Sequence, residues 1–517
     1  MAIKIVMLIV FFVITIGIGI YCKKQATDVR GFVLGGRSVG PWLTAFAYGT
    51  SYFSAVLFIG YAGQFGWKYG VAATCIGLGN ALIGSLMAWA VLGRRTRIMT
   101  QHLDASTMPD FFSKRFESKA LKIASAAIIF VFLIPYTASV FNGLSRLFGM
   151  AFNIDYSYCV IVMSALTAIY VILGGYMATA VNDFIQGCIM LVGIVVVVLA
   201  VLNINGGLSG SLEAMAMVTG STAAEQIPGI FNSFFGPDPI NLLGVVILTS
   251  LGTWGLPQMV GKFYAIKSEK DINIGTIVST VFALIVAGGC YFLGGFGRLF
   301  GDIIDYNPAN GVPVYDSIIP SMLSLLPDVL IALVVMLVLS ASMSTLSSLV
   351  LTSSSVLTLD FINATVDKGM DEKKKVSTMR LFILVFIVLS AAIALLQYKS
   401  SVTFIAQLMS ISWGALAGAF LGPFLYSLYW KKVTKAAVWA SFVCGVGLTT
   451  GNMLLGFMGK AIFASPINCG AAAMILSLII VPAVSMITAK PAPEKMDKVF
   501  ACYEEKVLVP KRKALED

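Results

Sequence analysis

Long apolar blocks recur along the whole chain, and they are the feature that most restricts its fold. Each block has roughly 20 residues, enough to cross the hydrocarbon core of a bilayer as an α-helix. Only 12% of the 517 residues are charged, about half the share found in soluble proteins. Backbone polar groups are satisfied in lipid only within helices or closed barrels, and these blocks are too long for barrel strands. The sequence therefore predicts an all-α polytopic membrane protein.

We assign thirteen membrane spans to these blocks. The first block has no small-residue cleavage site, so we interpret it as a retained span rather than a signal peptide. The predicted spans are 2–22, 41–66, 70–93, 120–146, 157–178, 182–203, 238–261, 272–297, 328–359, 379–398, 401–427, 434–457 and 467–488.

The basic residues gather between alternate spans. If the N-terminus lies outside, the inner loops and the C-terminal tail hold 29 of the 35 Lys and Arg residues. The positive-inside rule then predicts a multi-pass protein of the cell membrane with an outer N-terminus and a cytoplasmic C-terminus. The net charge of +10 reflects this orientation, so we expect membrane lipid, and no nucleic acid, among the partners.

The spans contain none of the usual catalytic groupings. The eight cysteines are scattered singly, and the one histidine, His102, lies in a polar loop. No acid pair and no nucleophile–base pair occurs within a span. We therefore expect the chain not to be an enzyme.

Two spans contain residues that interrupt helices. The second span has Gly49, and the seventh has Gly252, Gly255 and Pro257. Each is compatible with a simple kink, because glycine is common in membrane helices. The two spans lie five apart, however, and transporters place broken helices at matching positions of inverted repeats. Spans two to six and seven to eleven would then form a five-plus-five inverted repeat of the leucine-transporter type.

This interpretation divides the chain into five parts. They are an N-terminal extra helix with an inner loop (1–40), the first repeat (41–237), the second repeat (238–432), two C-terminal extra helices (433–488) and a cytoplasmic tail (489–517).

The ninth span has a high density of hydroxyl groups. Eleven of the twenty residues from 340 to 359 are Ser or Thr. At helical spacing, Ala341, Ser344 and Ser348 share one stripe, with Thr345 beside it. Neutral hard oxygens suit a small monovalent cation such as sodium. Small hydroxyl residues also pack helices together in membranes, so both interpretations are open at this point.

Asp183 is an acidic residue at the inner end of the predicted span 182–203. Acids at membrane depth commonly mark ion or proton paths. Because Gln186 follows three residues later, Asp183 also fits a helix N-cap within a capping box. The residues alone support both interpretations.

Three motifs resemble the sodium:solute symporter family, most of all its proline symporter branch. They are GGYMATAVNDFIQG at 174–187, GLPQMVGKFYAIKS at 255–268 and ASMSTLSS at 341–348, and the run from 30 to 51 is similar to the family's entry pattern. The resemblance extends over all thirteen predicted spans. It implies sodium-coupled symport of an amino acid or a small carboxylate-like solute by alternating access, with the monomer as the functional unit. A sugar, sialic acid or vitamin-like solute is the alternative.

By position, the resemblance implies two sodium sites. The main site would use carbonyl and hydroxyl oxygens of Thr50, Phe53, Ala341, Ser344 and Thr345. A second site, present in some members that include sialic acid symporters, would use Asp183, Ser344, Ser347 and Ser348.

The resemblance is weaker in the solute pocket. Tyr52 stands where the proline branch has an aspartate, and Thr249 and Thr253 replace its aromatic contacts, whereas Tyr136 matches. These departures argue against proline itself as the solute. The predicted solute-binding residues are Tyr52, Ser54, Gln64, Tyr136, Thr253 and Trp254.

Overall fold

The computed structural model describes residues 2–308, 311–367, 369–400 and 405–504. The start of the predicted span 401–427 and the end of the predicted tail lie outside the described residues. Within the described ranges, the regular secondary structure is helical, apart from two isolated bridges. This confirms the predicted all-α class.

The helices that build the bundle follow the predicted spans closely. The first half contains α1 (Ala2–Cys22), α2 (Val29–Leu34), α3 (Pro41–Tyr52), α4 (Ala62–Tyr69), α5 (Thr74–Gly79), α6 (Arg94–His102), α7 (Met108–Phe116), α8 (Lys119–Phe152), α9 (Tyr156–Ile204) and α10 (Gly207–Ala216). The second half contains α11 (Pro239–Gly255), α12 (Pro257–Ala265), α13 (Glu269–Gly295), α14 (Tyr315–Ser324), α15 (Asp328–Val356), α16 (Asn363–Thr365), α17 (Glu372–Ser400), α18 (Ile405–Tyr429), α19 (Lys435–Phe457), α20 (Pro466–Ile487) and α21 (Pro493–Phe500).

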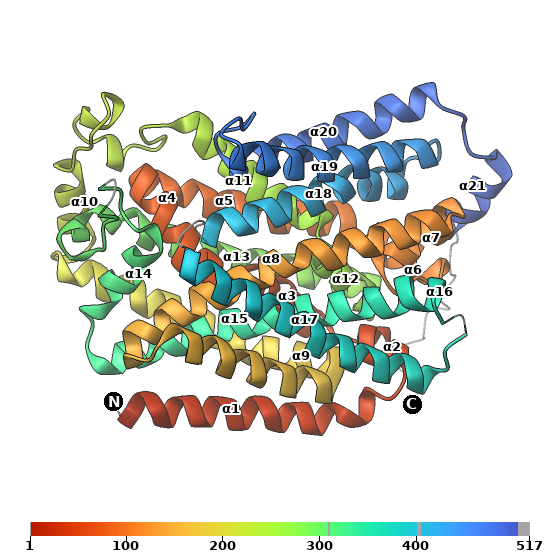
Figure 1. Ribbon diagram of the computed structural model, residues 1–517, viewed down its shortest axis with the longest axis horizontal. Helices are drawn as coiled ribbons and strands as arrows, with labels where there is room; N and C mark the ends of the chain where they lie inside the picture. The colour runs from red at the N-terminus through yellow and green to blue at the C-terminus, as the bar shows by residue number, and fades with distance from the viewer. Residues whose placement is uncertain (1, 309–310, 368, 401–404, 505–517) are drawn as a thin grey trace, which may run out of the picture.

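The long helices run along one common direction, so the bundle has two opposite ends (Figure 1). We call them the α10 end, which carries α10 and α14, and the α7 end, which carries α6, α7 and α21. Among the described residues, 10 helices are long and apolar enough to cross a membrane, or 11 with one bent pair counted as a single span. The number thirteen stays a prediction, because some predicted spans merge into longer helices.

The helix α9 shows how two predicted spans merge. Its backbone breaks at Gly175 (φ 55°, ψ −152°), a left-handed conformation that favours glycine. Tyr156 at its start lines a cavity with residues of α14, and the carbonyl of Leu202 near its end accepts a hydrogen bond from Ser211 of α10. Gly175 packs instead against Phe32 of α2. The chain therefore crosses the bundle twice within α9.

Two other spans are broken near the middle. The helix α3 ends at Tyr52, Phe53 is extended (φ −103°, ψ 99°), and a π-helical turn over Val56–Tyr61 leads into α4. In the second half, Leu256 is extended between α11 and α12, which bend by 45° relative to each other. Pro257 suits the first position of α12, because the amide that it lacks would have no helical partner there.

Gly49 and Gly252 were wrong as break positions. Both lie inside regular helix, Gly49 in α3 and Gly252 in α11, whereas Gly255 and Pro257 flank the break at Leu256. An added Cβ on Gly49 would lie 2.4 Å from the ring of Phe282, and one on Gly252 would lie 2.5 Å from Trp413. These two glycines therefore permit close packing between helices rather than a change of direction.

Close packing after the first break leads to a prediction about stability. An added Cβ on Gly66 of α4 would lie 1.9 Å from the carbonyl oxygen of Gly294 in α13. Because backbone cannot rotate out of the way, we expect Gly66→Ala to lower the free energy of unfolding by about 3 kcal/mol, the upper end for overpacked positions. Thermal unfolding in detergent measures this. Gly447→Ala is the control, since nothing lies within 4 Å of its added Cβ; equal losses in the two variants would contradict the prediction.

Candidate functional site

The hydroxyl-rich helix α15 lies inside the bundle rather than at its surface. It packs against α1, α3, α8 and α9, and Figure 1 shows it in the lower middle of the bundle, close to α3. Every residue from 334 to 350 is buried. The hydroxyl groups of this stretch therefore face other parts of the protein, and their partners are found on the neighbouring helices.

Four oxygen atoms from α3 and α15 form a ring, which we call the oxygen ring. The hydroxyl of Ser344 lies 3.0 Å from the carbonyl oxygens of both Thr50 and Ala341. The hydroxyl of Thr345 lies 3.2 Å from the Thr50 oxygen and 3.1 Å from the Ala341 oxygen. The Thr50 carbonyl is available because α3 ends at Tyr52, which leaves the carbonyls of its last turn without helical amide partners.

The oxygen ring has more short contacts than protons. Each hydroxyl carries one proton, so the two hydroxyls can make only two of the four contacts as linear hydrogen bonds. A cation at the centre would stabilise the remaining oxygens, which face each other without a proton between them. A planar ring with these edges would hold each oxygen about 2.2 Å from the centre, close to the roughly 2.3–2.6 Å of calcium–oxygen contacts. Sodium has nearly the radius of calcium, so the ring suits it.

Phe53 is the fifth residue predicted for this site. It follows α3 directly in extended backbone, and its amide donates to the carbonyl of Gly49 at 3.3 Å. Its ring packs on Tyr52, with centroids 4.3 Å apart. The structure thus brings the four residues of the oxygen ring into contact, with Phe53 beside them at the break.

The second predicted group of oxygens does not close into one site. Ser344 belongs to the oxygen ring, and the Ser347 hydroxyl donates back to the carbonyl of Ser344 at 2.8 Å. Asp183 and Ser348 do share a neighbour, which is the ammonium of Lys262. It lies 3.8 Å from the carboxylate of Asp183 and donates to the Ser348 hydroxyl at 3.0 Å.

The N-cap interpretation of Asp183 was wrong. The second part of α9 already begins at the break at Gly175, so Asp183 lies two turns inside the helix and is fully buried. Both of its carboxylate oxygens lack a hydrogen-bond donor among the described residues. This leaves the ion pair with Lys262 as the interaction that the structure gives for its charge.

Sequence reasoning missed Lys262 by counting it as an inner-loop residue. The structure places it in α12 with 3% of its surface exposed. The reason is the break at Leu256, after which α12 continues to Ala265 inside the protein. One signal was available in the sequence, because Gln258 and Lys262 lie four residues apart and so share one face of a helix.

The predicted solute residues Tyr52 and Tyr136 meet at a tryptophan that sequence reasoning also missed. Tyr52 stacks on Trp413 of α18 with ring centroids 5.6 Å apart, and Tyr136 meets the same indole edge-on at 5.8 Å. Ser54 lies at the break, where its hydroxyl accepts from the amide of Val56. The signal for Trp413 was a lone aromatic residue in the small-residue stretch SISWGALAG, 410–418.

The other predicted solute residues lie elsewhere. The hydroxyl of Thr253 donates to the carbonyl of Gly84 at 2.9 Å, and the indole of Trp254 donates to the carbonyl of Ile83 at 3.0 Å. Both side chains therefore bind the neighbouring third span. Gln64 is buried in α4, and its side-chain oxygen has no hydrogen-bond donor among the described residues.

Cavities differ in size between the two ends of the bundle. At the α10 end, a cavity of about 940 Å³ reaches Phe65 and Tyr69 of α4 and Val245 of α11. At the α7 end, a cavity of about 50 Å³ is lined by Thr107, Lys262 and other residues. The structure is thus hollowed at the α10 end and nearly closed at the α7 end.

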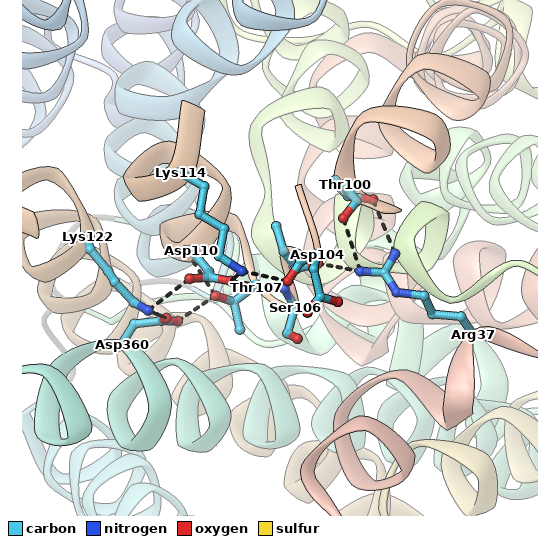
Figure 2. Close-up of polar contacts among 10 residues, drawn as sticks. Arg37, Thr100, Asp104, Ser106, Thr107, Asp110, Lys114, Lys122 and Asp360 are labelled. Carbon is cyan, nitrogen blue, oxygen red and sulfur yellow. Dashed lines mark hydrogen bonds and ion pairs between the residues drawn. The ribbon is translucent and has the colours of Figure 1, made fainter. Parts of the chain in front are cut away.

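A charged network closes the α7 end next to the small cavity. Lys122 of α8 lies 2.9 Å from Asp110 of α7 and 3.2 Å from Asp360, which follows α15. Figure 2 shows Lys122 beside Asp110 and Asp360, and Thr107 donating to Asp360 at 2.5 Å. Burial raises the pKa of Asp110, but Lys122 and Lys114 lower it more, so the pKa is below its usual value. Because Thr107 also lines the cavity, the network fixes one of its walls.

Comparisons with known proteins agree with this geometry. The model of the sodium:solute symporter family matches residues 32–445. The osmoregulated proline transporter OpuE of Bacillus subtilis is 30% identical, over 93% of this chain and 94% of its own. A sodium/proline symporter of Staphylococcus aureus is 33% identical, over 85% of this chain and 84% of its own. A substrate-bound, outward-open Na+-coupled sialic acid symporter shares the fold, with a TM-score of 0.74, 16% identity and coverage of 94% of this chain and 98% of that one.

Proposed function

The chain belongs to the sodium:solute symporter family, and we propose that the oxygen ring binds the sodium ion that drives its transport. The function is sodium-coupled import of a small organic solute through a membrane; the family and its named relatives are transporters, not enzymes. The observation that carries the proposal is the meeting of Thr50 with Ser344 and Thr345 across the break in the second span.

The position of the oxygen ring explains how sodium would control the transport cycle. Two of its oxygens belong to α3, next to the broken segment, or depend on that break, and the others belong to the continuous helix α15. A sodium ion in the ring would join these two helices, and its release would let them separate. One sodium ion entering along a membrane potential supplies about 2.3 kcal/mol per 100 mV for solute accumulation.

We also propose that the α10 end faces outward, with the N-terminus outside and the C-terminus in the cytoplasm. The concentration of Lys and Arg in the loops of the α7 end supports this orientation. The cavity of about 940 Å³ would then open to the outside. The division into repeats at 41–237 and 238–432 stays our proposal, supported by the two breaks near Phe53 and Leu256.

For the solute, we propose a pocket beside the aromatic residues next to the first break. Tyr52, Tyr136 and Trp413 would supply its apolar walls, and Ser54 and Gln64 its polar groups. An amino acid or another small carboxylate-like compound fits this mixture, and the relatives named as proline transporters support an amino acid. A sugar, sialic acid or vitamin-like compound is the alternative that the experiment must include.

The experiment is uptake into proteoliposomes, preceded by a thermal-shift panel. The panel contains L-proline, other amino acids, small carboxylates, sugars and vitamins, each in sodium and in potassium. We expect the true solute to raise the unfolding temperature more in sodium, because coupling between two ligands is reciprocal. That compound should then accumulate under an inward sodium gradient. Accumulation driven equally well by a proton gradient without sodium would contradict the proposed function.

A further inference from the structure

Lys262 brings a positive charge to the place where the second predicted sodium site would lie. Its ammonium is 3.8 Å from the carboxylate of Asp183 and 3.0 Å from the hydroxyl of Ser348. Asp183 and Ser348 are the two members of that predicted site whose oxygens are not directed to the oxygen ring or to their own helix. A lysine therefore contacts the oxygens that a second sodium ion would need.

The surroundings of this ammonium are those of a bound cation. Tyr176 presents its ring face to it, with the nitrogen 5.2 Å from the ring centroid, an arrangement that attracts cations. Asp183 is fully buried, and its oxygens have no other donor among the described residues. The hydroxyl of Ser348 also lies 2.6 Å from that of Ser51 in α3. Carboxylate, hydroxyl and aromatic face thus converge on one nitrogen atom.

Charge balance argues against a sodium ion beside this lysine. The pair of Asp183 and Lys262 is neutral as it stands, with both side chains almost completely buried. Adding sodium would place two cations next to one carboxylate in an environment of low dielectric constant, where like charges repel strongly. Sodium could occupy this place only if the ammonium moved away.

Resting on the proposed function, we propose that the Lys262 ammonium takes the place of a second sodium ion at Asp183 and Ser348. The chain would then bind one sodium ion per transport cycle, at the oxygen ring. The lysine would act as a positioning residue that holds α12 to α9 and α15, a link that sodium would otherwise make and release in each cycle.

The test is equilibrium binding of radioactive sodium to the purified full-length chain, with no solute present. We expect one sodium ion per chain in the wild type and two in Lys262→Ala, in which Asp183 is free to bind sodium. Lys267→Ala is the matched control, since Lys267 is exposed and lies five residues further along; it should bind one. An unchanged count in a folded Lys262→Ala protein would overturn the proposal.

A second variant keeps the test decisive if Lys262→Ala does not fold. The double variant Asp183→Asn, Lys262→Met removes both charges together and leaves no unpaired ion. If Lys262 is the resident cation, this variant binds as many sodium ions as the wild type. If Asp183 binds sodium in the wild type, the count falls by one, which would overturn the proposal. The proposed function is judged separately, because it fails if the wild type binds no sodium at all, whatever the differences between variants.

Discussion

Thr345→Ala is expected to raise the sodium concentration for half-maximal uptake by about 10- to 100-fold. The variant removes one of the four oxygens of the oxygen ring. A polar contact to a charged group contributes roughly 1.5–3 kcal/mol, which corresponds to this loss of affinity. The measurement is initial uptake into proteoliposomes at several sodium concentrations, or sodium-dependent thermal stabilisation if the solute is still unidentified.

Two control variants separate the loss of an ion ligand from a loss of structure. Thr345→Ser keeps the hydroxyl and should require nearly the wild-type sodium concentration. Ser342→Ala removes a buried hydroxyl from the same helix that only bonds the carbonyl of Val338 at 2.7 Å, so its sodium dependence should not change. If Thr345→Ala and Ser342→Ala behaved alike, the oxygen ring would not be the sodium site.

The oxygen ring shows what a sequence can predict about such a protein. The helical period places Ser344 and Thr345 side by side on one helix, and the family resemblance places Thr50 opposite them. The structure brings these residues to within hydrogen-bonding distance. The prediction was possible because it depends on regular helix geometry and on residue types whose oxygens have few other uses inside a membrane protein.

The break positions show a limit of that approach. Glycine content suggested Gly49 and Gly252, yet the chain leaves the helix at Phe53 and Leu256. Glycine has two roles in a membrane helix, since it weakens the helix and also lets another helix approach closely. Which role applies depends on the neighbour, here Phe282 or Trp413, and a sequence does not show the neighbour.

Lys262 shows a second limit, which comes from counting charges. A lysine just after an apolar block is normally an inner-loop residue, and the count of basic residues is hardly changed by one exception. Its burial follows from the direction of α12 after the break and from the presence of Asp183 on another helix. Both are tertiary facts, so the residue that most affects the second site was the one that topology rules placed outside it.

The second large effect is expected from Lys122→Met, which should destabilise the closed α7 end. Asp360 is 1% exposed, and its ion pair is with Lys122 at 3.2 Å. Removing one partner of a buried ion pair leaves an uncompensated charge and costs roughly 3–5 kcal/mol. Asp110 keeps Lys114 at 3.0 Å, so the loss should fall mainly on Asp360 and on the segment that contains Thr107. Thermal unfolding and hydrogen exchange of the amides from 105 to 111 measure it.

The double variant Lys122→Met, Asp360→Asn distinguishes a buried charge from lost packing. Because it removes the uncompensated carboxylate, we expect it to recover much of the stability and to slow the hydrogen exchange again. Lys374→Met is the control, since its ion pair with Asp367 is largely exposed and such pairs contribute at most about 1 kcal/mol. If Lys122→Met were no more harmful than Lys374→Met, the network would not hold the α7 end closed. Faster exchange confined to 105–111 would instead show that closure of the small cavity depends on one ammonium between two carboxylates.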